Sequence, residues 1–154
     1  MSIDASHRLP SVPAATRWRD TMLDVSRGLA AAGVLLSADV HLDLWDLQGY
    51  RQIHIIGPLF LLNVIGGIVV GVAVLVWRHW LPALAAAGFG ASTLIAFWLS
   101  VTVGTFGLKE TATGSAQVLA EIAEIVALVF GLAAAALSRP SIADFLRALR
   151  RARS

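Results

Sequence analysis

Two acidic residues lie inside an apolar segment that is long enough to cross a lipid bilayer. Glu121 and Glu124 occur in the first half of the run from 117 to 137. Together with Gln117 they are spaced four and three residues apart, so all three share one face of a helix. An ionised carboxylate in hydrocarbon costs at least ~2.5 kcal/mol, and such residues therefore usually face a bundle interior, a water-filled cavity or a partner.

The chemistry available to this pair is the binding of a proton or a cation. Two carboxylates close together in a medium of low dielectric constant resist double ionisation and can share a proton. A structural role is the alternative. In that case the glutamates pair with Arg51, Lys109 or a basic residue of a partner subunit, or stay protonated and hydrogen-bond across helices.

Other polar residues are expected at the same end of the molecule as the two glutamates. Asp39, Asp43 and Glu110 lie in or beside the connections between apolar segments, and Asn63 lies at a similar depth in another segment. Asn63 is also typical of a hydrogen bond that holds two membrane helices together. The candidate residues for binding a cation, a proton or a partner are Glu121, Glu124, Asp39, Asp43, Asn63 and Glu110.

Two histidines give a second, different hypothesis. His41 and His54, with Asp43, offer imidazole nitrogens and a carboxylate, which are competent ligands for zinc, copper or another divalent metal. Helical bundles also hold haem between two histidines. The spacing matches no specific metal signature, so the alternative is that both histidines hydrogen-bond to the loop backbone, to acidic residues or to lipid headgroups.

The composition indicates an integral membrane protein. The chain has 154 residues, of which 57% are hydrophobic and only 14% charged. It has no cysteine, which excludes disulfides, thiolate metal sites, iron–sulfur clusters and thiol catalysis. The basic residues cluster near the chain ends and in particular connections, as a membrane topology requires, and this pattern argues against nucleic acid as a partner.

The apolar segments predict an all-α, four-helix membrane bundle. We expect a polar tail over 1–21 and a basic tail over 139–154. Gly67 and Gly71 are spaced to let a neighbouring helix approach closely, while Asp24 and Arg27 are spaced to form an ion pair. The predicted spans are about 22–40, 53–77, 81–108 and 115–137.

The last residues are expected to form an amphipathic helix on an anionic membrane surface. Apolar side chains fall on one face of this segment, and the basic residues fall elsewhere on it. The basic residues assigned to this surface are Arg147, Arg150 and Arg151.

The distribution of positive charge predicts the orientation. Of the 12 Lys and Arg residues, only Arg51 and Lys109 fall in the connections 41–52 and 109–114, and the other ten flank the opposite ends of the spans. Positive charge is enriched on the cytoplasmic side of membrane proteins, so we expect both termini in the cytoplasm and the protein in the cytoplasmic membrane. The acidic site would then open outward.

Several short segments resemble one group of proteins. They are His41-Leu42-Asp43-Leu44-Trp45, Gly49-Tyr50-Arg51, Ile56-Gly57-Pro58-Leu59-Phe60-Leu61-Leu62 and Phe106-Gly107-Leu108-Lys109-Glu110. This pattern is similar to that of small four-span integral membrane proteins of actinobacteria and covers about 41–124. The resemblance implies a four-span topology and assigns no role to any residue.

These observations favour a non-enzymatic membrane component. It would be an accessory subunit or a small oligomeric transport protein whose outer acids bind a cation, a proton or a partner. The second hypothesis is a metal- or haem-binding redox protein that uses His41, His54, Asp43 and the two glutamates. The third is a packing subunit of a larger complex. The expected partners are the lipid bilayer and further copies or other subunits of a membrane complex.

Overall fold

The computed structural model describes residues 14–104 and 114–139, and within these ranges it contains four α-helices, one 3-10 turn and no strand. The elements are α1 (Ala14–Asp46), η1 (Tyr50–Gln52), α2 (Ile56–Val76), α3 (Trp80–Thr102) and α4 (Ser115–Ser138). All four helices are long and apolar enough to cross a membrane, which confirms the prediction of an all-α chain with four candidate spans. Glu110 and the predicted amphipathic segment with Arg147, Arg150 and Arg151 lie outside the described residues.

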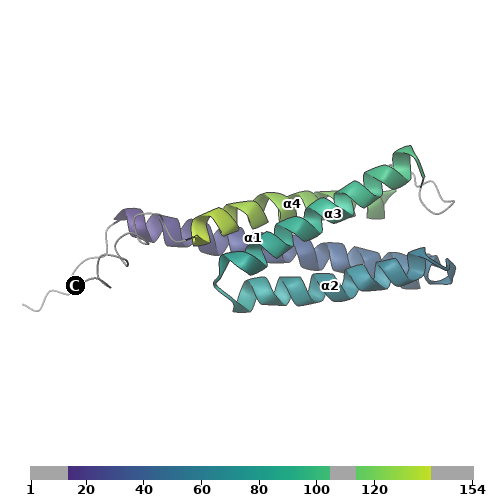
Figure 1. Ribbon diagram of the computed structural model, residues 1–154, viewed down its shortest axis with the longest axis horizontal. Helices are drawn as coiled ribbons and strands as arrows, with labels where there is room; N and C mark the ends of the chain where they lie inside the picture. The colour runs from purple at the N-terminus through teal and green to yellow at the C-terminus, as the bar shows by residue number, and fades with distance from the viewer. Residues whose placement is uncertain (1–13, 105–113, 140–154) are drawn as a thin grey trace, which may run out of the picture.

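The helices run alternately in opposite directions, and α1 and α4 lie side by side at the centre (Figure 1). Helix α2 packs mainly on α1, and α3 packs mainly on α4. The connection 77–79 joins α2 and α3 at one end, which we call the narrow end. From there the two helices diverge toward the opposite end, which we call the wide end and which carries the connection 47–55 (Figure 1).

Helix α4 fits between α1 and α3 because small residues let the backbones approach closely. A Cβ atom on Gly33 of α1 would lie 2.6 Å from the carbonyl oxygen of Ala123, and one on Gly131 of α4 would lie 2.8 Å from the carbonyl oxygen of Ala83 in α3. Gly90 of α3 lies equally close to the α4 backbone. The buried face of α4 carries only small apolar side chains besides Glu124, namely Ala120, Ala123, Ala127, Ala134 and Ala135.

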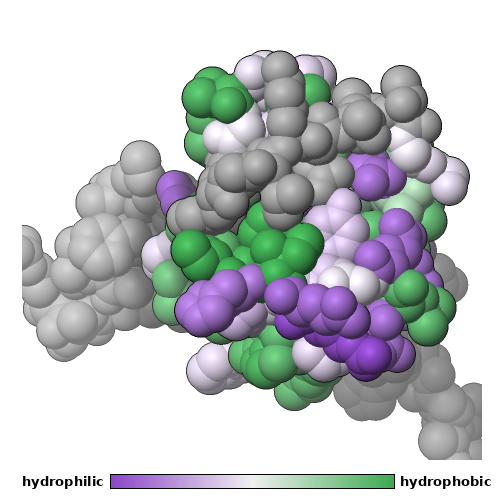
Figure 2. Space-filling model, turned by 90° about the vertical axis from the view of Figure 1, so that its right-hand side faces the viewer, coloured by the Kyte–Doolittle hydropathy of each residue, from purple (hydrophilic) through white to green (hydrophobic). Residues whose placement is uncertain are grey.

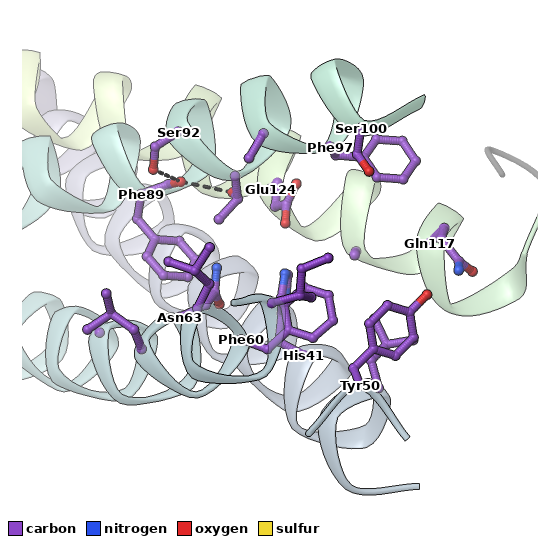
Figure 3. A pocket seen from close by; sticks show the side chains of 18 of the residues that line it. His41, Tyr50, Phe60, Asn63, Phe89, Ser92, Phe97, Ser100, Gln117 and Glu124 are labelled. Carbon is purple, nitrogen blue, oxygen red and sulfur yellow. Dashed lines mark hydrogen bonds between the residues drawn. The ribbon is translucent and has the colours of Figure 1, made fainter. Parts of the chain in front are cut away.

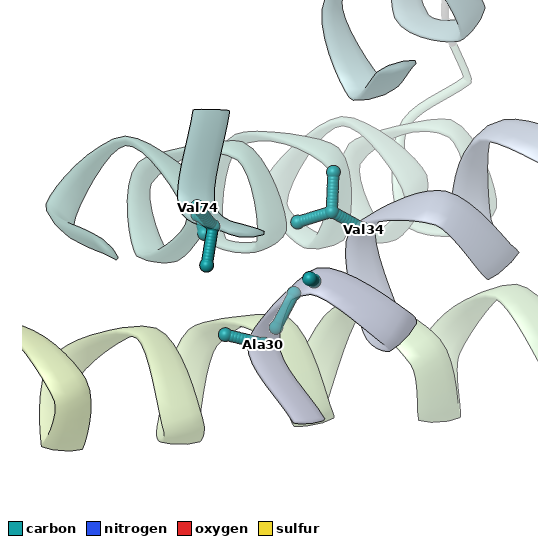
Figure 4. Close-up of a cluster of buried hydrophobic side chains, with 6 residues drawn as sticks. Ala30, Val34 and Val74 are labelled. Atoms are coloured by element: carbon teal, nitrogen blue, oxygen red, sulfur yellow. The ribbon is translucent and has the colours of Figure 1, made fainter. Parts of the chain in front are cut away.

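A dense apolar core fills the half of the bundle nearer the narrow end. Ala30 and Val34 of α1 pack with Val74 of α2, and all three are fully buried (Figure 4). Gly67 and Gly71 of α2 face α1, which agrees with the close helix approach predicted from their spacing. Among the described residues, the buried polar side chains lie in the other half of the bundle or close to its narrow end.

Helix α1 is longer than its predicted span at both ends. It begins at Ala14, so 14–21 is helical although we predicted it as part of a tail. No glycine or proline interrupts this stretch, and the Arg19 guanidinium donates a hydrogen bond of 2.7 Å to the carbonyl oxygen of Leu137 in α4. At the other end the helix continues past Val40 because Leu44 is also buried, and Gly49 then turns the chain with a φ of 84°.

Asp24 and Arg27, whose spacing would allow an ion pair, make their direct polar contacts with other groups. Asp24 pairs with Arg78, which lies in the connection between α2 and α3. Arg27 is only 5% exposed and donates hydrogen bonds to the carbonyl oxygens of Leu75 (3.1 Å) and Trp77 (2.7 Å). The last carbonyls of a helix lack partners within the helix and carry partial negative charge, so a buried arginine is well placed there.

Helix α3 ends at Thr102, earlier than the predicted end of the third span at 108. The backbone of Gly104 has a φ of 82°, a conformation that glycine adopts readily and that commonly terminates a helix. The apolar character of the following residues extended the predicted span beyond this stop.

Gly33 provides a test of the close contact between α1 and α4. We expect Gly33→Ala to lower the free energy of unfolding by about 1–3 kcal/mol, since the new methyl group meets backbone atoms. Gly28→Ala in the same helix is the matched control, because nothing lies within 4 Å of its added Cβ atom. Thermal unfolding of both variants in mild detergent measures the difference, and equal melting temperatures would contradict the packing described.

Candidate functional site

A pocket of about 490 Å³ lies between α2 and α3 on the side of the wide end, where the two helices have separated (Figure 3). Residues of α1 and α4 also line it. Two of its lining residues in α2, Leu59 and Leu62, are 47% and 64% exposed, so the pocket reaches the outer surface of the bundle. Its aromatic residues are Tyr50, Phe60, Phe89 and Phe97, and its polar residues include His41, Asn63, Ser92, Thr93, Glu121 and Glu124.

Glu124 lies deep in this pocket and has no cationic partner among the residues that the structure describes. Its side chain is 2% exposed, and the fully buried Ser37 hydroxyl donates a hydrogen bond of 3.1 Å to Glu124 Oε1. An unpaired buried carboxylate is costly, so this group must either carry a proton or meet a cation.

His41 lies beside this pair, one helical turn along α1 from Ser37. Its Nδ1 atom is 2.8 Å from the Ser37 carbonyl oxygen, and because a carbonyl only accepts hydrogen bonds, Nδ1 carries the hydrogen. In the neutral ring, Nε2 then presents a lone pair. The ring is further fixed by an edge-to-face contact with Phe60, at a centroid distance of 5.1 Å.

Several other polar groups in the pocket can accept hydrogen bonds, and the Asn63 and Gln117 amides also carry N–H donors. Asn63 Oδ1 is buried and has no hydrogen-bond partner within the described part of the chain. The Ser92 hydroxyl donates to the carbonyl oxygen of Phe89, and the Thr93 hydroxyl donates to the carbonyl oxygens of Phe89 and Gly90. Their hydrogens are thus used within α3, and their oxygens keep free lone pairs.

The structure separates the predicted binding residues into two groups. Glu121, Glu124 and Asn63 line the pocket, and so does Gln117 on the same face of α4. Asp39 and Asp43 do not. They line a second hollow of about 390 Å³ between α1 and the start of α4, together with Asp46.

The structure does not bring together the proposed metal ligands His41, His54 and Asp43. His41 faces the pocket, His54 is exposed in the connection between α1 and α2, and Asp43 accepts a hydrogen bond of 3.3 Å from Gln48. Within 14–104 and 114–139 no group of three or more His, Asp or Glu side chains is placed to hold a metal ion. For the same reason, His41 and His54 are not placed to ligate one haem together.

Hydrophilic side chains gather over the connection between α1 and α2 at the wide end (Figure 2). Arg51 lies in this connection and forms an ion pair with Asp46 at 3.1 Å. This pairing disagrees with the structural alternative in which Arg51 neutralises the two glutamates. The other basic residue proposed for that role, Lys109, lies outside the described residues.

Sequence reasoning missed Ser37 and the aromatic residues of the pocket. Ser37 precedes His41 by four residues, so helical spacing alone would have placed the two on one face. Phe60, Phe89 and Phe97 had no such signal, because they are ordinary apolar residues of membrane helices. They line a pocket only because α2 and α3 diverge.

Glu124→Gln is expected to fold normally. The amide oxygen still accepts the hydrogen bond from Ser37, and the substitution leaves no described cation without a partner. The melting temperature in mild detergent should stay within a few degrees of the native value, while Ser37→Ala serves as a comparison that removes the same hydrogen bond from the other side. Loss of folded protein with Glu124→Gln would instead reveal a structural ion pair.

Comparison with known proteins gives no significant match. No protein-family model matches the chain, and neither a curated protein nor a solved structure shows significant similarity to it. The basis for a functional assignment is therefore the pocket between α2 and α3 and the distribution of charge along the bundle.

Proposed function

We propose that this chain is a multi-pass protein of the cytoplasmic membrane whose pocket binds a small molecule or cation from the outer side. In this role it is the ligand-binding part of a small transport protein or an accessory subunit of a larger membrane complex. The observation that carries the proposal is Glu124, a buried acid without a cationic partner in the described residues, in a pocket that reaches the surface.

The shape of the pocket supports binding of a small molecule. Its volume of about 490 Å³ falls within the usual range for small-molecule sites, which are mostly apolar and contain a few polar groups that orient the ligand. Here His41 and Glu124 line the pocket, and hydrogen bonds to Ser37 hold both side chains in place. Such groups deep in a membrane span are most often functional.

The charge distribution supports the proposed orientation. In the described residues, Arg17, Arg19, Arg27, Arg78 and Arg139 lie toward the narrow end, and Arg51 lies at the wide end. From the positive-inside rule we expect the narrow end in the cytoplasm and the wide end, with the pocket, outside. Both ends of the described chain, near Ala14 and Arg139, lie at the narrow end (Figure 1).

The tightly packed inner half supports ligand binding from outside. Ala30, Val34 and Val74 leave the pocket no continuation toward the narrow end, and they are fully buried. Passage of a ligand to the cytoplasm therefore requires a second conformation, in which this cluster separates. In this proposal the described conformation would correspond to the outward-facing state of a transport cycle or to the permanent state of a binding subunit.

The proposed orientation predicts which cysteines react on intact cells. The native chain has no cysteine, so a single substitution reports on one position. We expect Leu47→Cys, at an exposed site of the wide end, to react with a membrane-impermeant maleimide. His79→Cys at the narrow end should react only after the cells are permeabilised. The opposite pattern would reverse the orientation and would place the pocket on the cytoplasmic side.

Filling the pocket tests whether it binds ligands. Gly66 lines the pocket and has nothing within 4 Å of an added Cβ atom, so Gly66→Leu should fold and occupy pocket volume. Gly88→Leu in α3 is the matched control, since it also has open space but does not line the pocket. Two fluorescent probes are suitable, dansylcadaverine and its neutral N-acetyl derivative.

We expect at least one probe to bind saturably to the native protein in nanodiscs. Gly66→Leu should weaken that binding by about tenfold or more, equivalent to about 1.4 kcal/mol, and Gly88→Leu should leave it unchanged. If neither probe saturates, or if both variants bind like the native protein, the pocket is not a binding site and the proposed function fails.

A further inference from the structure

We infer that the ligand is an amphipathic amine, with N–H donors that meet Glu124 and an apolar or aromatic body that fills the space between α2 and α3. This inference rests on the proposed function and adds the chemical class of the ligand. It follows from the hydrogen-bonding capacity, the charge and the walls of the pocket.

The polar groups around Glu124 are arranged to accept hydrogen bonds. His41 Nδ1 is committed to the Ser37 carbonyl oxygen, which leaves the lone pair of Nε2 as an acceptor. Asn63 Oδ1 is a buried acceptor without a partner in the described residues. A ligand that donates to His41 Nε2 and to the Glu124 carboxyl group therefore gains hydrogen bonds that a ligand with acceptors alone cannot make with them.

The Glu124 carboxyl group favours a ligand whose hydrogen-bond donor is also positively charged. A hydrogen bond between an ammonium and a carboxylate is charge-assisted and stronger than a neutral one. Ser37 also donates to Glu124 Oε1, and this hydrogen bond stabilises the ionised form once the cation is present. An anionic ligand would supply no cation to Glu124 and would add a further acidic group beside Glu121 and Glu124 in the same pocket.

The walls of the pocket favour an organic cation over a metal ion. Phe60, Phe89 and Phe97 line the pocket, and aromatic faces attract ammonium groups as well as apolar bodies. A hard metal ion requires several oxygen ligands at fixed distances, and no group of three acidic or histidine side chains is placed for this within the described residues. A pocket of about 490 Å³ also far exceeds the volume of a single ion.

The position of the pocket suits entry from the bilayer. Its rim residues Leu59 and Leu62 are exposed on the outside of a span, where lipid chains lie. A neutral amine dissolves in that layer and can move between α2 and α3. On arrival its nitrogen takes the proton of the Glu124 carboxyl group, which yields an ammonium–carboxylate pair with no net charge. No uncompensated charge is then created inside the membrane.

Three probes that share the dansyl group and the alkyl chain test the inference. They are dansylcadaverine, its neutral N-acetyl derivative and its trimethylammonium derivative, which keeps the charge but has no N–H group at that end. Titration of the native protein in nanodiscs of zwitterionic lipid gives the three dissociation constants by dansyl fluorescence. The variants are Glu124→Gln and, as a matched loss of one carboxylate outside the pocket, Asp39→Asn.

We expect the native protein to bind dansylcadaverine at least about tenfold more tightly than either derivative, as one charge-assisted hydrogen bond provides this difference. Glu124→Gln should remove the preference, and Asp39→Asn should retain it. Equal binding of the amine and either derivative, or an unchanged preference in Glu124→Gln, would overturn the amine as ligand class. If the neutral probe then still binds and Gly66→Leu still weakens its binding, the proposed function survives. Failure of all probes to saturate rejects both.

Discussion

The close contact of α4 with α1 and α3 is the constraint on which the rest of the structure depends. Gly33 and Gly90 allow the backbones of α1 and α3 to approach α4 from two sides, at Ala123 and at Glu124. A helix held in this way has one face fully enclosed. Glu124 belongs to that face, because it follows Ala120 by four residues and precedes Ala127 by three. The acid is therefore buried by the same packing that holds the bundle together.

The pocket forms where helices do not pack against each other in this way. Helices α2 and α3 are attached to the central pair, but they contact each other little beyond the narrow end, where the connection 77–79 joins them. At that end Arg27 binds the last carbonyls of α2, and Arg78 pairs with Asp24. These contacts fix α2 to α1 at one end. The divergence at the other end then leaves a space lined by apolar side chains, with Glu124 inside it.

Much of the fold could be predicted from the sequence, since long apolar segments report directly on membrane helices. Apolar character did not predict helix ends that depend on polar contacts. An example is the start of α1, which we predicted as a tail and where Arg19 hydrogen-bonds to α4. Helical spacing placed Gln117, Glu121 and Glu124 on one face, and all three line the pocket. Helical spacing does not indicate which helices diverge from each other. The sequence therefore grouped Asp39 and Asp43 with the glutamates, although α1 turns them toward a second hollow.

The two halves of the bundle differ in a way that limits what the site does in this conformation. Toward the narrow end, Ala30, Val34 and Val74 are packed without space for a ligand, while the pocket beside Glu124 reaches the surface. A buried acid of this kind is stable either with its own proton or with a cation in its place. Exchange of the two states at the open side needs no rearrangement of the core. Release toward the narrow end would require Val74 and its neighbours to leave α1, against the hydrogen bonds that Arg27 makes with the end of α2. For the proposed ligand, binding and release on the wide side are therefore the steps that the packing permits most easily.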